Sequence, residues 1–226
     1  MKRYLPILLA LLILLSAFGC SILGTGGEKN IVKYDIELSM VRKASDINQR
    51  YRAPVADTSL GGVTRYAYED DLFRSIWSAT EAGWELVLNN KSEKPIVIDW
   101  DDVVYYDIDN MSHKVLSNKT KFADKGNEQE PTLVAKRGTI DEKLSSATHI
   151  YQSPVYGFTK RPLFPIDFSE AIRYKNKEFK LMIPFTVDGL SAQYEFVFTI
   201  KDVTQELSAS DPWSAYLTDR ALGTNF

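Results

Sequence analysis

The sequence predicts an all-β protein, an antiparallel immunoglobulin-like β-sandwich with a short C-terminal helix. Short stretches in which apolar and polar residues alternate recur along most of the 226 residues, separated by turn-forming residues. Aromatic residues make up 12% of the chain, and together with many Val and Ile they favour strands over helices. The third observation is an Asp-Gly pair that lies between two long alternating runs.

The clearest element is a β-hairpin over residues 179–200, centred on Asp188-Gly189. An Asp-Gly pair favours a type I′ turn, because both central positions need a positive φ. A two-residue turn predicts the cross-strand pairs Val187–Leu190, Phe185–Ala192, Ile183–Tyr194, Leu181–Phe196 and Phe179–Phe198. Each pair places apolar residues on the same face, so a second layer must cover that face.

The other strands are expected in chain order, beginning with the alternating run 31–40. Residues 43–62 are polar and rich in turn formers, and they predict a long loop. We expect the runs 84–88 and 96–100 to form a second hairpin with a longer loop. The remaining expected strands cover residues 64–68, 72–78, 103–108, 113–116, 132–135 and 147–151.

A helix is expected near the end of the chain. Asp211 suits the N-cap, Pro212 the first helical position and Gly223 the stop. One side of this helix would carry Trp213, Tyr216, Leu217 and Ala221. We expect it to pack on the sandwich; docking of a partner and disorder are the alternatives.

The chain begins with Lys2-Arg3, an apolar run from Leu5 to Phe18, and Ala17-Phe18-Gly19-Cys20. The run is short for a membrane span and suits a secretory signal. Its end resembles the lipobox of bacterial lipoproteins, which implies cleavage before Cys20 and attachment of lipid to Cys20. An uncleaved anchor helix is the alternative.

This resemblance divides the chain into four parts. Residues 1–19 would be the lipoprotein signal peptide, 20–30 the lipidated cysteine and a flexible Gly-rich tether, 31–204 the β-sandwich domain and 205–226 the C-terminal helical tail. The membrane, reached through lipidated Cys20, and an envelope protein are the partners this implies. By the sorting rule of enteric bacteria, Ser21 after the cysteine points to the outer membrane, facing the periplasm.

Composition excludes several classes of function. Cys20 is the only cysteine, so a lipidated chain has no disulfide and no thiolate nucleophile. The formal net charge is −3, and loss of the basic leader makes it more negative by two, which argues against nucleic-acid binding. No cofactor motif is present, and we expect no cofactor.

Candidate catalytic and metal sites are few. The acidic residues of 99–102, with Asp107 and Asp109, are the best calcium candidates, against the alternative of ordinary turn and strand-edge chemistry. His113 and His149 are the only histidines, which excludes a three-histidine zinc site within one chain. A nucleophile elbow is missing, and a Ser-His-Asp triad is recognised by geometry, not by spacing. We therefore predict no catalytic residue.

The segment 149–168 is rich in Pro and aromatic residues and contains Lys160-Arg161. We expect a long loop here, and long loops are often functional. The alternative is a self-packed loop that covers one end of the sandwich. The residues expected to bind a ligand or partner are Tyr151, Tyr156, Phe158, Phe164 and Trp213.

These patterns favour a lipid-anchored envelope lipoprotein that acts as a non-enzymatic interaction or structural module. The second hypothesis is a lipoprotein that binds carbohydrate or another small ligand through the 149–168 segment, because aromatic side chains stack on sugars. The third is an envelope hydrolase.

Overall fold

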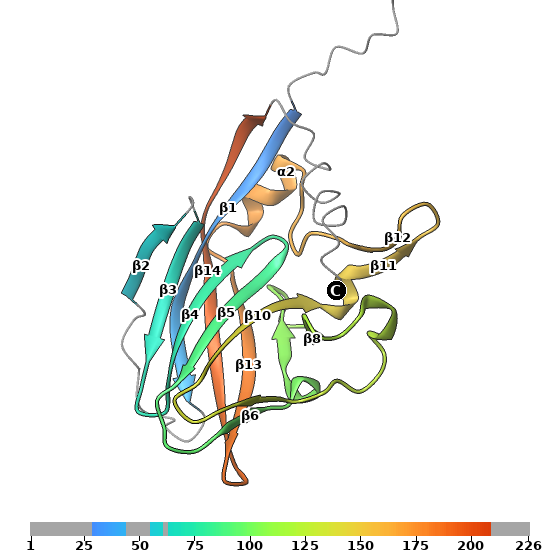
Figure 1. The fold of residues 1–226 in the computed structure, drawn as a ribbon. Helices are drawn as coiled ribbons and strands as arrows, with labels where there is room; N and C mark the ends of the chain where they lie inside the picture. Colours follow the sequence, from blue (N-terminus) through green and yellow to red (C-terminus); the bar gives the residue numbers. More distant parts are fainter. Residues whose placement is uncertain (1–28, 44–54, 61–62, 209–226) are drawn as a thin grey trace, which may run out of the picture.

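A long, strongly curved antiparallel sheet dominates the computed structural model, which describes residues 29–43, 55–60 and 63–208 (Figure 1). Its strands are β1 (Lys29–Lys43), β2 (Val55–Leu60), β3 (Val63–Glu69), β4 (Phe73–Thr80), β5 (Gly83–Asn90), β6 (Ile96–Ile98), β7 (Val104–Tyr106), β8 (Ser112–Ser117), β9 (Thr132–Val134), β10 (Thr139–Ser146), β13 (Glu178–Val187) and β14 (Leu190–Ser208). The predicted all-β antiparallel class is confirmed.

Smaller elements complete the described part of the chain. Strands β11 (Ile150–Ser153) and β12 (Gly157–Lys160) form a separate two-stranded sheet. The α-helix is α2 (Phe168–Ala171), and the 3₁₀ helices are η1 (Trp100–Asp102), η2 (Phe122–Asp124), η3 (Ala147–His149) and η4 (Ile172–Tyr174).

The sheet follows the order β1-β14-β13-β7-β8-β10-β5-β4-β3-β2, with β6 and β9 attached beside β13. Strand β8 joins the two halves of this path, because it pairs with β7 on one side and β10 on the other. The sheet curls so that β3, β4 and β5 lie across from β13 and β14, as the two layers of a sandwich (Figure 1).

The β13–β14 hairpin has the register that the sequence predicts. Val187 faces Leu190, and the pairing continues through Phe185–Ala192, Ile183–Tyr194, Leu181–Phe196 and Phe179–Phe198. Asp188 has a φ of 51° and Gly189 a φ of 76°, so both turn residues adopt the left-handed conformation that a type I′ turn requires.

The layer that covers this hairpin consists largely of aromatic side chains from β3, β4 and β5. The ring of Trp77 lies 4.7 Å from that of Phe196, and the ring of Phe73 lies 4.6 Å from that of Phe185. Trp84 reaches Phe179 at 6.1 Å. These rings are buried, and their tilted contacts are the geometry that aromatic pairs prefer.

The expected second hairpin is wrong. Strand β5 pairs with β4 and β10, whereas β6 pairs with β13 and β9. The buried side chain of Asn90 explains the crossing, since its amide nitrogen donates to the carbonyls of Lys94, Val134 and Ala135 at 2.7–3.2 Å. These bonds direct the chain from one layer to the other at the end of β5.

Three strands lie where none was expected, and one of them, β12, belongs to the segment 149–168 that is described below. Strand β2 falls inside the predicted loop 43–62 and pairs only with β3, and such an edge strand needs little apolar alternation. Strand β10 was missed because polar residues occupy its buried positions, among them Glu142, Ser145 and Ser146. Glu142 lies 3.1 Å from Lys119, which offsets part of the cost of burying its carboxylate.

The helical content also differs from the expectation. Helix α2 was not predicted; the side chain of Asp167 caps it by accepting from the amides of Ser169 and Glu170. The helix expected to start at Asp211 lies outside the described residues.

We predict that Phe196→Ala lowers the free energy of unfolding by about 3–5 kcal/mol, because it leaves a cavity between the two aromatic layers. Leu190→Ala is the matched control: Leu190 is on the same strand but 79% exposed, and its loss should change stability by no more than about 0.5 kcal/mol. Urea denaturation of both variants measures the difference. Equal losses would contradict the assigned layer packing.

Candidate functional site

The segment 149–168 contains a β-hairpin, so the expectation of a loop without secondary structure is wrong there. Strands β11 and β12 form a hairpin in which Ile150 faces Lys160 and Ser153 faces Gly157. The Ser153 hydroxyl accepts hydrogen bonds from the amides at the tip, at 3.2 and 3.3 Å, and Gly157 has a φ of 71°. This hairpin projects from the body of the molecule (Figure 1).

The hairpin exposes large apolar side chains at and near its tip. Val155 is 76% exposed, Tyr156 50% and Phe158 36%. Tyr151 is partly buried, and the guanidinium of Arg161 lies 4.2 Å from its ring centre. Among the predicted binding residues in the described part of the chain, Tyr156 and Phe158 are therefore the exposed ones.

Phe164 occupies a different place from the other predicted binding residues. It is buried, and its ring lies 5.0 Å from Tyr34 and 5.2 Å from Phe179. The Tyr34 hydroxyl donates to the carbonyl of Pro165 at 2.5 Å, and burial raises the pKa of Tyr34 well above its usual range. Phe164 thus fixes the chain after the hairpin to the core and does not serve as a contact residue.

The base of the hairpin is held by a chain of polar side chains. Asp107 lies 2.8 Å from Nε2 of His113, and Nδ1 of His113 lies 3.1 Å from the Thr148 hydroxyl. Thr148 contacts the Ser146 hydroxyl at 2.9 Å, and this hydroxyl lies 3.0 Å from Nδ1 of His149. The two histidines, 36 residues apart in the sequence, face each other with ring centres 6.1 Å apart.

The network shifts the titration of two of its members. Burial lowers the pKa of His149, and the nearby His113 and Arg161 lower it further, while Asp107 opposes them. Burial alone would raise the pKa of Asp107. Hydrogen bonds from His113 and from the amides of Met111 and Asp109 outweigh that effect and hold the pKa below its usual range.

Backbone contacts tie the same network to the hairpin. The amide of Arg161, just after β12, donates to the carbonyl of His149, just before β11, at 2.7 Å. Lys125 donates to the carbonyl of Ile150, and Leu163 donates to the carbonyl of Glu81 at 2.7 Å. The base of the hairpin, which we call its root, is therefore held by hydrogen bonds on several sides.

Three of the acidic residues considered for calcium, Asp99, Asp101 and Asp107, bind neighbouring amides or side chains. Asp99 caps η1 through the amide of Asp101. A hydrogen bond from Lys114, 2.8 Å away, holds the pKa of Asp101 below its usual range, and the amide of Gln129 adds a second bond. Among residues 29–43, 55–60 and 63–208, no group of three or more His, Cys, Asp or Glu side chains is placed to hold a metal ion.

The order Asp107–His113–Thr148 has the connectivity of a hydrolytic triad, in which a carboxylate orients a histidine beside a hydroxyl. Thr148 is exposed, so a substrate carbonyl has access to its side chain. Spacing gives no sign of this group: the three residues come from the end of β7, from β8 and from η3, and only the fold brings them together.

Two predicted site residues, Cys20 and Trp213, lie outside the described residues. Within the described part of the chain, no helix has the length and apolar character that crossing a bilayer requires. Comparisons with known protein families, with curated proteins and with solved structures find no match to this chain.

The depressed pKa of His149 predicts a pH-dependent hairpin root. An opened root binds more protons than the closed one, so this contribution is complete above about pH 6.5 and is lost as the pH falls toward the lower pKa of the closed form. We expect the amide of Arg161 to lose protection from hydrogen exchange between pH 7 and pH 5, after correction for the intrinsic rate.

The control is His149→Asn, which keeps a polar side chain and removes the titration. Its Arg161 amide should show the same protection at both pH values. A wild-type protein without any pH dependence, or a variant with the same loss, would contradict the assignment to His149.

Proposed function

We propose that this protein is a lipid-anchored, non-enzymatic contact module of the bacterial cell envelope, and that the β11–β12 hairpin is its contact surface. The main support for this proposal is the exposure of Val155, Tyr156 and Phe158 on one short, projecting hairpin. The lipobox-like sequence that ends at Cys20 supports the anchor.

The clustering of these residues supports a binding role. Single exposed apolar residues are common on protein surfaces, but neighbouring ones mark interaction sites. Tyr is also enriched at such sites, since it offers a large apolar ring with a polar tip. The fixed root means that little conformational entropy is lost when the hairpin binds.

The test places a photoreactive phenylalanine analogue at position 156 in living cells, with the same analogue at position 190 as control. Leu190 is 79% exposed, against 50% for Tyr156, and it lies beside the β13–β14 turn. We expect cross-linked products from position 156 and none from position 190. We also expect Cys20→Ala to leave the membrane fraction and to lose the products.

The absence of any product from position 156, in a protein that still sits in the membrane fraction, would contradict the contact surface. Soluble wild-type protein would contradict the anchor. Products from both positions at equal yield would show only that the analogue reacts with its surroundings. This result would contradict the assignment of the β11–β12 hairpin as the contact surface.

The second candidate function is an acyl hydrolase, and the Asp107–His113–Thr148 arrangement is the observation that favours it. A general base beside an exposed hydroxyl is the minimum that nucleophilic catalysis needs. Donors that would stabilise an oxyanion contribute a further 10²–10³-fold or so in such enzymes.

A panel of fluorogenic esters distinguishes the two functions. Under the leading proposal, wild type and Thr148→Ala give the same signal as buffer. Turnover by wild type that falls at least about 100-fold in Thr148→Ala, while Thr148→Ser retains it, would replace the contact module with the hydrolase.

A further inference from the structure

We infer that the surface formed by residues 150–177, which contains the β11–β12 hairpin, α2 and η4, docks on the anionic lipid bilayer that carries the anchor. We call it the 150–177 surface. The inference rests on the proposed function and deepens it, because it names the partner of the same hairpin.

Exposed apolar side chains are concentrated on this surface. Eight large hydrophobic residues are exposed in the described part of the chain, and five of them belong to the 150–177 surface. These five are Val155, Tyr156, Phe158, Ile166 and Ile172. The other three are scattered: Met111 follows β7, Leu133 is in β9 and Leu190 begins β14.

The charge of the 150–177 surface is opposite to that of the whole chain. The formal net charge of the protein is −3, yet residues 150–177 contain five basic side chains and two acidic ones. One of the acidic residues, Asp167, is engaged in capping α2. One of the basic residues, Lys175, pairs with Asp202 at 2.7 Å. Basic residues close in the chain to exposed apolar ones fit an anionic bilayer, where apolar groups enter the interface and cations meet the headgroups.

The position of the surface agrees with the anchor. Pro165, beside exposed Ile166, contacts Tyr34, which lies five residues after the start of β1 at Lys29. Only eight residues separate Cys20 from Lys29, and a chain of that length spans at most about 30 Å. Any lipid on Cys20 therefore holds the start of β1, and α2 with it, near the bilayer.

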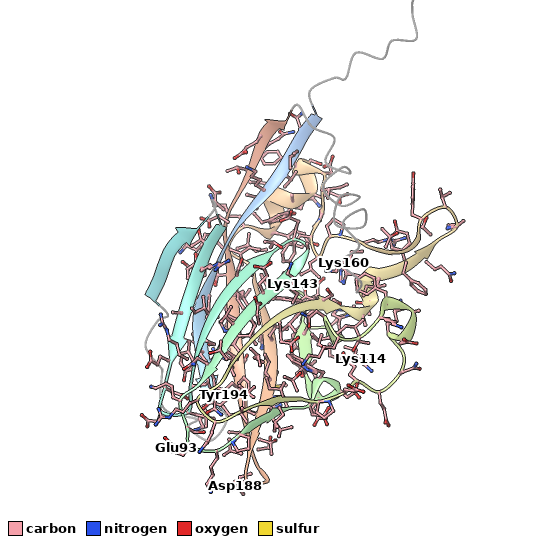
Figure 2. All side chains as sticks on the ribbon, viewed as in Figure 1. Glu93, Lys114, Lys143, Lys160, Asp188 and Tyr194 are labelled. Atoms are coloured by element: carbon pink, nitrogen blue, oxygen red, sulfur yellow. The ribbon has the colours of Figure 1, made fainter. Side chains whose placement is uncertain are left out.

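The two ends of the molecule differ accordingly. Helix α2 and the start of β1 lie toward one end, on the side to which the β11–β12 hairpin projects, whereas the β13–β14 turn lies at the other end (Figure 1). Figure 2 shows Asp188 at that far end, well away from Lys160, the last residue of β12.

A bilayer fits this surface better than a protein does. The anchor makes the bilayer a partner at very high effective concentration, so even a weak contact is occupied. A tip with one aliphatic and two aromatic side chains suits the interface, where Tyr is enriched.

The experiment uses the mature lipoprotein purified from membranes and reconstituted in vesicles. The chain has one cysteine, so once lipid occupies Cys20, Val155→Cys provides the only thiol for an environment-sensitive dye. The matched control is Leu190→Cys, which carries the dye at a site of similar exposure. Vesicles of phosphatidylcholine alone are compared with vesicles that also contain phosphatidylglycerol, an anionic lipid of the kind that attracts basic segments.

We expect dye at position 155 to shift to the blue and to be quenched by lipid-borne quenchers, more strongly with phosphatidylglycerol, and dye at position 190 to stay in water. The double charge reversal Arg173→Glu with Lys177→Glu, at two exposed positions, should remove the phosphatidylglycerol-dependent part of the blue shift and of the quenching. The double reversal Lys121→Glu with Lys136→Glu, also at exposed positions, should not.

The outcomes separate this inference from the proposed function. Protein that floats with the vesicles while dye at position 155 stays in water overturns bilayer docking and leaves the anchored module intact, with a protein as the remaining partner. Equal shifts in both kinds of vesicle overturn the requirement for anionic lipid. Protein that does not float overturns the anchor and the docking together.

Discussion

The burial of one aromatic face between the β13–β14 hairpin and strands β3–β5 is the interaction on which the rest of the structure depends. Trp77, Phe73 and Trp84 lie against Phe196, Phe185 and Phe179, and all six side chains are buried. This contact closes the two halves of one continuous sheet onto each other. The projecting hairpin lies outside this core, and Ile150 at its base packs with Leu116 and Ala147 in a separate small cluster.

The sequence predicts what local chemistry decides. Asp188-Gly189 specifies its own turn, and strict alternation specifies the register and the buried face of β13–β14. Two features that depend on contacts distant in the sequence were mispredicted. The direction of the chain after β5 depends on the buried amide of Asn90. Strand β10 lacks the alternating hydrophobic pattern of a strand, because its buried positions include Glu142. A pattern of alternating hydrophobicity does not reveal buried polar side chains whose hydrogen-bond or ion-pair partners are distant in the sequence.

The candidate site was predictable to a similar degree. The aromatic composition of 149–168 made this segment the candidate site, and Tyr156 and Phe158 are exposed there. Composition does not predict that Phe164 is buried in the core. It also does not predict that the rings of His113 and His149, which are 36 residues apart in the sequence, lie close together. The polar network at the hairpin root combines a structural role with a titratable one. Its compact geometry explains how a small two-stranded element stands firmly away from the main sheet.

Attachment to lipid is the premise of the proposed role, because an anchor at Cys20 would bring the projecting hairpin close to a membrane. The most direct measurement is the mass of the N-terminal peptide from protein extracted from bacterial membranes. The proposal predicts a peptide that begins at Cys20 and carries the added mass of a diacylglyceryl group. A peptide that begins elsewhere, or one with an unmodified Cys20 thiol, would contradict it.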